Sequence, residues 1–336
     1  MNFKDIYGHE KIKELLMRSV AENKIGHAYI FDGKSGVGRL STALAFAAAQ
    51  MCEASVSGNA CGNCENCNLS RGASHPDIRV ITNELYDPSK AEGRAVSVDT
   101  IRAMKKEIYI KPYVAPRKVY IVPNADTMTA AAQNSLLKVL EEPPSYCTII
   151  LISENFNAFL PTVLSRAAVI KFAPLSVSEI LQYLNDTQEE NSQSFEVVSK
   201  MCGGSIKAAK ELLDNEDIIK ARGEILQLLL GLKNLKKTGA YSLIAYAKKN
   251  KKMSAAILET IGTFLSDLLI IKNYETKNGI VNIDIYENLQ DFANQITVET
   301  PLKMLDIYVK YSKMLQANGN YAACIECLIL GLHDVR

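Results

Sequence analysis

Short apolar runs alternate with amphipathic stretches over about the first half of the chain, and this alternation is typical of a parallel α/β sheet. The runs are short and rich in branched and aromatic residues, as expected for buried strands. They predict five strands, at Ala28–Phe31, Ile78–Ile81, Val119–Val122, Thr148–Ile152 and Ala168–Phe172.

The stretches between these runs have helical spacing. Asp99 is the expected N-cap of a helix that places Ile101, Met104 and Ile108 on one face. A second helix is expected from about Thr129 to Glu142 and has to end at Pro143-Pro144, because proline cannot continue a helix.

Leu, Ile, Ala and Lys at helical spacing dominate after Pro174, and strand patterns almost disappear. We therefore expect an α/β domain over residues 1–173, a small all-α domain over 174–215 and a larger all-α domain over 216–336. A chain of 336 residues is long enough for two or three domains. The net charge of +1 gives no global attraction to nucleic acid or membrane. Without an apolar leader or a membrane-length apolar run, we expect a cytoplasmic protein.

A glycine loop, Gly33-Lys34-Ser35-Gly36-Val37-Gly38, follows the first predicted strand and precedes an Ala-rich helix. That context is the one in which a phosphate-binding P-loop occurs, although glycine turns before helices are also common. A P-loop then supplies a lysine for the phosphates and a hydroxyl for Mg²⁺, and here Arg39 and Leu40 hold those places. The third strand should be followed by carboxylates, but Pro123 and Asn124 follow it. The loop formed by Gly33, Gly36, Gly38 and Arg39 is thus a degenerate P-loop, for which tight binding of Mg-ATP is not expected.

Cys52, Cys61, Cys64 and Cys67 form a C-x₈-C-x₂-C-x₂-C pattern. Four thiolates in this spacing suit tetrahedral Zn²⁺ and leave no open position, so a structural zinc site is the favoured interpretation. An iron–sulfur cluster also takes four cysteines, and a redox pair is a further alternative. His75 lies near the cluster but is not needed as a ligand.

Several further motifs resemble the clamp-loader branch of the AAA+ family over residues 1 to about 215. They are Ile25-Gly26-His27-Ala28-Tyr29, His75-Pro76-Asp77, the run from Asn134 to Pro144, and Pro161-Thr162-Val163-Leu164-Ser165-Arg166. The resemblance implies that residues 174–215 are a lid domain and residues 216–336 an oligomerisation collar. It also implies that Lys207 stands where active members carry an arginine that touches nucleotide.

Members of this family form rings in which one subunit offers an arginine to the ATP of its neighbour, and the matching residues here are Ser165 and Arg166. The resemblance thus implies an arginine finger in trans, whereas Arg166 could also cap a helix end or pair with a surface carboxylate. The implied partners are gamma/tau and delta clamp-loader subunits and, through the complex, the sliding clamp and primed DNA.

We therefore expect a clamp-loader subunit without catalysis of its own, within a DNA-directed DNA polymerase holoenzyme. One alternative is an autonomous AAA+ ATPase or nucleotide-sensing subunit that uses Arg39. Another is a DNA-binding module that uses the cysteine cluster. The basic run Lys248–Lys252 could contact phosphates, but such runs are usually solvated helix ends.

Overall fold

The computed structural model describes residues 2–86, 96–188, 194–233, 237–274, 276–277 and 279–335. The chain forms two compact units, Met1–Glu190 with Gly203–Ala208, and Asn191–Cys202 with Ala209–Arg336. The division into three domains after residues 173 and 215 stays a prediction.

The first unit contains a five-stranded parallel sheet, which confirms the five strands predicted from the apolar runs. The strands are β1 (Ala28–Gly33), β2 (Ile78–Val80), β3 (Lys118–Val122), β4 (Cys147–Ser153) and β5 (Ala168–Phe172). Their order is β2-β3-β4-β1-β5, so β1 lies between β4 and β5. Tyr29 of β1 pairs with Ile150 on one side and Ala168 on the other.

Helices precede, connect and follow these strands. They are η1 (Phe3–Asp5), α1 (Glu10–Ala21), α2 (Arg39–Met51), α3 (Glu65–Arg71), α4 (Asn83–Tyr86), α5 (Val98–Ile108), η3 (Ala125–Thr127), α6 (Ala130–Glu141), η4 (Phe156–Ala158), α7 (Pro161–Leu164) and α8 (Val177–Thr187). The expected N-cap Asp99 is wrong: Ser97 caps α5, because its hydroxyl accepts the backbone N–H of Thr100 and Asp99 lies inside the first turn. The helix expected to start at Thr129 is confirmed, with Thr129 as its N-cap.

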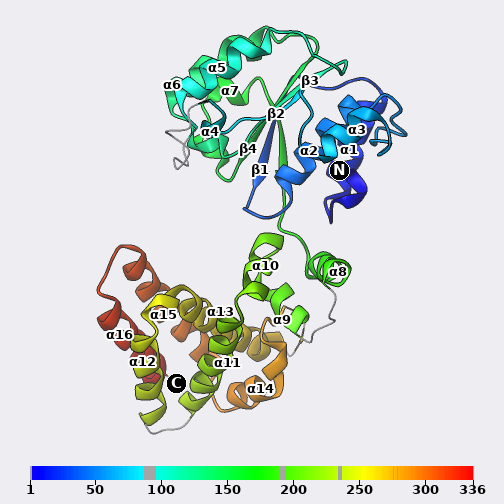
Figure 1. Cartoon of the computed structure of the whole chain (residues 1–336). Coiled ribbons are helices and arrows are strands. Elements are labelled where there is room, and N and C mark those ends of the chain that lie inside the picture. Colours follow the sequence, from blue (N-terminus) through cyan, green and yellow to red (C-terminus); the bar gives the residue numbers. More distant parts are fainter. Residues whose placement is uncertain are drawn as a thin grey trace. The chain divides into compact units, whose positions relative to one another are not determined.

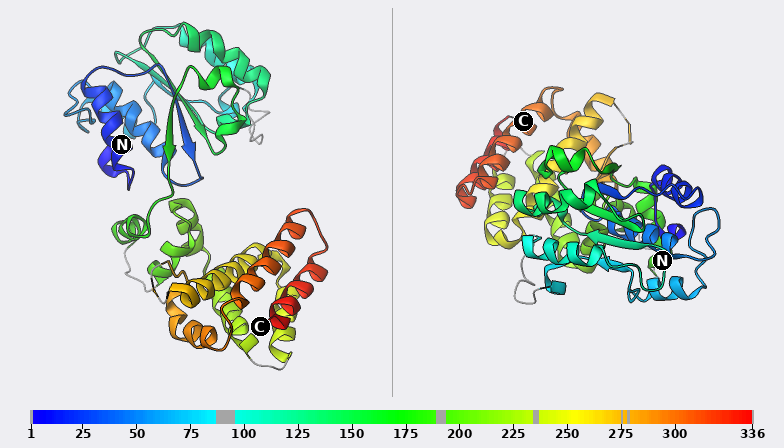
Figure 2. Two further views of the ribbon diagram at one scale, coloured as in Figure 1. Left: turned by 180° about the vertical axis from the view of Figure 1, so that it is seen from behind. Right: turned by 90° about the horizontal axis from the view of Figure 1, so that it is seen from above.

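The sheet is covered on both faces, as the two views of the first unit show (Figures 1 and 2). Successive residues of a strand point to opposite faces, so Ile30 packs with α5, α6 and α7 while Phe31 packs with α1 and α2. Burial on both faces explains why the strands read as continuous apolar runs.

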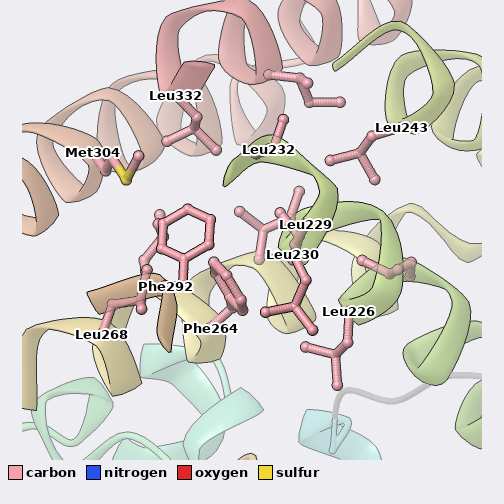
Figure 3. Close-up of a cluster of buried hydrophobic side chains, with 14 of the residues drawn as sticks. Leu226, Leu229, Leu230, Leu232, Leu243, Phe264, Leu268, Phe292, Met304 and Leu332 are labelled. Atoms are coloured by element: carbon pink, nitrogen blue, oxygen red, sulfur yellow. The ribbon is translucent and has the colours of Figure 1, made fainter. Parts of the chain in front are cut away.

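The remaining helices are α9 (Ser194–Met201), α10 (Ile206–Asp214), α11 (Glu216–Leu230), η5 (Gly231–Lys233), α12 (Thr238–Lys249), η6 (Lys251–Met253), α13 (Ser254–Tyr274), η7 (Ile283–Ile285), α14 (Tyr286–Asn294), α15 (Thr300–Gln316) and α16 (Tyr321–Asp334). Apolar side chains from α11, α12, α13, α14, α15 and α16 form the core of the second unit (Figure 3). At its centre the rings of Phe264 and Phe292 meet edge to face, with centroids 5.6 Å apart.

One stretch, Lys251–Tyr274, is long and apolar enough to cross a membrane by length and composition alone. In the structure it contains α13, whose Phe264, Leu265 and Leu268 are buried in the helical core. A core helix passes the same test of composition, so this stretch is only weak support for a membrane span.

Candidate functional site

The glycine loop lies at the carboxyl end of β1, the strand at which the sheet order reverses between β4 and β5. Parallel α/β sheets bind ligands at this kind of switch point. Gly36 and Gly38 have φ values of +75° and +98°, a left-handed conformation that favours glycine. The loop then leads directly into α2. The glycines therefore lie in a tight turn between a central parallel strand and the start of a helix.

Arg39, which stands in the place of the P-loop lysine, is bound by its own chain. Its side chain is only 7% exposed, and Nη1 donates a hydrogen bond to the carbonyl oxygen of Ser153. Nη2 lies 3.1 Å from Oε1 of Glu154, which follows β4. The guanidinium charge is thus neutralised within the chain.

Leu40, Asn124 and Asp126 lie at or near the positions expected from the sequence for the remaining groups of a P-loop ATPase. Leu40 is 42% exposed and offers no oxygen for a metal. After β3, Asn124 adopts a left-handed conformation with φ +50° at the start of a short 3₁₀ turn. The nearby Asp126 carboxylate accepts the backbone N–H of Glu154 at 3.2 Å, so it holds the chain after β4.

The glycine loop is also contacted from two further segments. The carbonyl oxygen of Gly36 accepts the backbone N–H of Ile206 at 2.9 Å, and a Cβ at Gly36 would come within 2.2 Å of Ser205 Oγ. The same Cβ would lie 2.6 Å from Cβ of Lys207, so the structure places Lys207 beside the loop. Nε2 of His9 donates to the carbonyl oxygen of Val37 at 2.8 Å. The loop is therefore closely surrounded by its own chain.

Arg166 follows α7 and lies at the surface, with 35% of its side chain exposed. Its Nη1 donates to the carbonyl oxygen of Thr162 at 3.0 Å and to Oγ of Ser165 at 3.1 Å. Its Nη2 lies 2.9 Å from Oε1 of Glu141, the last residue of α6. Both structural roles considered from the sequence, a helix-end contact and a surface ion pair, are therefore present in the isolated chain.

The four cysteines of the predicted metal site come together, with all four sulfur atoms within 4.8 Å of one another. Cys52 follows α2, Cys61 lies in the connecting loop, and Cys64 and Cys67 lie at the start of α3. The sulfurs of Cys61 and Cys67 are 3.9 Å apart, and those of Cys52 and Cys64 are 4.0 Å apart. Zinc–sulfur bonds of about 2.3 Å place the sulfurs of a tetrahedral site about 3.8 Å apart. The cluster therefore fits a tetrahedral metal ion.

Three of these thiols have shifted pKa values. Backbone N–H groups of Asn63 and Cys64 lower the pKa of Cys61 to about 6, whereas burial raises the pKa of Cys67 to about 12. Burial also raises the pKa of Cys52. A metal that binds four thiolates has to displace the protons that the buried thiols otherwise keep. All four cysteines are free of disulfide bonds.

Buried polar contacts connect the cysteine module to the sheet. Asn66, between two of the cysteines on α3, accepts a hydrogen bond from Nε2 of His75 at 3.1 Å, and Nδ1 of His75 accepts the backbone N–H of Asp77 at 3.1 Å. The Asp77 carboxylate accepts the backbone N–H groups of residues 113–115 at 2.7, 2.9 and 3.0 Å. His75 is therefore a structural residue outside the ligand set.

Comparison with known proteins decides the family. A family model described as "DNA polymerase III, delta subunit" matches residues 8–176, half of the chain. The chain belongs to this family. It is 27% identical over 330 residues to DNA polymerase III subunit delta' of Bacillus subtilis, a match that covers 96% of each protein. Subunit delta' of Pseudomonas aeruginosa is 30% identical over 215 residues, covering 63% of this chain and 62% of that protein.

A second kind of relative is the tau subunit of DNA polymerase III. The tau subunit of Bacillus subtilis is 26% identical over 330 residues, covering 92% of this chain but 57% of that protein. The chain thus spans little more than half the length of this relative.

Two carboxylates in these sites were not found from the sequence. Glu154 pairs with Arg39 although it lies 115 positions further along the chain. The signal in the sequence was weak: an acidic residue stands two positions after the end of the predicted strand Thr148–Ile152. Glu141 pairs with Arg166, and here the sequence indicated a surface carboxylate without showing which one.

Proposed function

We propose that this chain is a non-hydrolysing subunit of a DNA polymerase III clamp loader. The observation that carries this proposal is its membership of the delta family, together with similarity to a delta' subunit over 96% of both chains. In this role it assists ATP-dependent loading of the sliding clamp onto primed DNA in the cytoplasm. Its partners are gamma/tau and delta subunits, and its residues 216–336 form the collar.

The surroundings of Arg39 support the absence of hydrolysis. A P-loop lysine has to be available to the β- and γ-phosphates, but the Arg39 guanidinium is buried against Ser153 and Glu154. Releasing it would leave the Glu154 carboxylate beside an incoming nucleotide, where like charges repel. Leu40, Pro123 and Asn124 supply neither a metal ligand nor a general base.

Arg166 is the residue with which this subunit contributes to ATP hydrolysis at the site of a neighbouring subunit. An arginine finger needs a guanidinium that a neighbouring subunit can reach, and Arg166 is partly exposed at the end of a short helix. Ser165 accepts a hydrogen bond from it and helps to fix its plane. The neighbour's γ-phosphate is then stabilised in trans as charge develops during transfer.

The cysteine cluster is proposed to hold structural zinc. Four sulfur ligands at tetrahedral spacing leave no position for water or substrate, which separates structural from catalytic zinc sites. Bound zinc would cross-link the end of α2 to the start of α3. No chemistry of the complex is assigned to it.

Two measurements test the proposal. Calorimetry of the isolated chain with Mg-ATP is expected to show no binding at millimolar nucleotide, and micromolar binding would favour a nucleotide-sensing subunit instead. In a complex with gamma/tau and delta subunits, Arg166→Ala is expected to reduce ATP hydrolysis by about 10³-fold at the adjacent site. Arg102→Ala is the matched control, because Arg102 is also an exposed arginine beside an acidic residue, Asp99.

A further inference from the structure

We infer that Glu141 is a positioning residue for Arg166, holding the guanidinium in the orientation from which it is offered to the neighbouring subunit. This inference rests on the proposed role of Arg166. On this inference, the guanidinium of Arg166 is already oriented in the free chain, before the complex assembles.

The two residues stand at the ends of helices that the core fixes. Glu141 is the last residue of α6, whose Leu136, Val139 and Leu140 are buried against the sheet. Arg166 follows α7, whose Val163 is fully buried in the same cluster. Because both backbones are anchored, the 2.9 Å contact between Nη2 and Oε1 sets where the guanidinium lies.

The place of Glu141 in its helix is locally unfavourable. The carboxyl end of a helix carries partial negative charge, so an acidic residue in the last turn is destabilising unless a cation compensates for it. Lys138 lies in the same turn, and Arg166 supplies a second cation, from another element, in direct contact with Glu141. Residues that are unfavourable for the local stability of a helix often belong to functional sites, and the contact with Arg166 gives Glu141 such a function.

The remaining donors of Arg166 suit recognition of an oxyanion. Nη1 donates to Thr162 and Ser165 and Nη2 contacts Glu141, so within the described ranges of the chain the Nε–H and the second N–H of Nη2 remain as donors. Guanidinium binds phosphate through a planar fork of such N–H groups. Thr162, Ser165 and Glu141 therefore fix the plane and leave donors for an incoming oxygen.

The ion pair is also weak enough to be exchanged. The side chains of Arg166 and Glu141 are 35% and 50% exposed, and ion pairs with this exposure contribute little to stability. A phosphate forms stronger charge-assisted bonds and can replace Glu141 as the partner of Nη2. Glu141 thus orients the side chain of Arg166 and still allows a phosphate to bind it.

The test compares variants in a complex reconstituted with gamma/tau and delta subunits, by kcat and KM for ATP in the presence of primed DNA and clamp. Glu141→Ala is expected to lower kcat about tenfold through misplacement of the guanidinium, with KM and assembly on gel filtration unchanged. Glu141→Gln should restore most of kcat, because its amide oxygen can still accept from Nη2. The matched control is Glu142→Ala, which removes the adjacent exposed carboxylate.

The double variant Glu141→Ala with Arg166→Ala is expected to match Arg166→Ala alone, since the two residues act as one unit. A kcat for Glu141→Ala equal to or above that of Glu142→Ala would overturn the inference, provided that Arg166→Ala is slow. If Arg166→Ala itself turns over normally, the proposed function of Arg166 fails and the inference fails with it.

Discussion

Replacing Asp77 with alanine should destabilise the first unit strongly. The Asp77 side chain is fully buried and accepts three backbone N–H groups, those of Tyr113, Val114 and Ala115. Alanine leaves all three donors without an acceptor. A buried donor without a partner costs about 1–3 kcal/mol, and a partly buried one costs less because water can reach it.

The magnitude follows from the burial of each donor. The N–H of Ala115 is buried, and those of Tyr113 and Val114 are partly buried. With about 2 kcal/mol for the first and about 1 kcal/mol for each of the others, we expect a loss of about 4 kcal/mol. Asp77→Asn can retain the two bonds to the oxygen that serves Val114 and Ala115 and loses only the bond from Tyr113, so its expected loss is about 1 kcal/mol.

Urea unfolding followed by circular dichroism measures this loss, and native-state hydrogen exchange of amides 113–115 assigns it to the first unit. Asp99→Ala, which removes an exposed carboxylate in the same unit, is the control. The reasoning is refuted if Asp77→Ala is no less stable than Asp99→Ala, or if exchange at residues 113–115 stays as slow as in the parent chain.

Three further predictions follow from the same structure. If the cysteine cluster holds the proposed zinc, a chelator should increase hydrogen exchange over residues 52–67 and, through Asn66 and His75, at residues 113–115. Exchange that is identical with and without chelator would contradict this connection. Phe264→Ala should cost the second unit about 3–5 kcal/mol in urea unfolding, because the ring is fully buried against Phe292, whereas Tyr274→Ala, at 74% exposure, should cost less than about 1 kcal/mol. Burial lowers the pKa of the His75 imidazole in the folded chain, so the unfolded chain takes up the proton at a higher pH and the free energy of unfolding should fall as the pH drops below about 6.5. In His75→Gln this part of the pH dependence should disappear, and an unchanged slope of stability against pH would count against the prediction.

The strands were predictable because their environment leaves a direct trace in the sequence. A central parallel strand is buried on both faces, so β1, β3 and β4 consist almost entirely of apolar residues. The cysteine cluster was predictable for a related reason, since short loops between ligands determine which sulfurs can converge. Both features depend on local sequence.

The missed features depend on contacts between distant segments. Residue spacing could not show that Arg39 pairs with Glu154. The sequence around α2 would look the same if this arginine bound a phosphate instead. The role of Asp77 was equally hidden, since its three donors lie 36 to 38 residues further along the chain. The cap of α5 was misplaced by two residues, because Ser97 and Asp99 are both good N-cap residues and only the backbone decides between them.

The most direct test of the account is DNA-stimulated ATP hydrolysis and clamp loading by a complex of this chain with gamma/tau and delta subunits, measured with Arg166 and with Arg166→Ala. The account predicts that the isolated chain hydrolyses no ATP, that the complete complex does, and that Arg166→Ala lowers hydrolysis and loading while the complex still assembles. Hydrolysis by the isolated chain, or full activity of the Arg166→Ala complex, would contradict it.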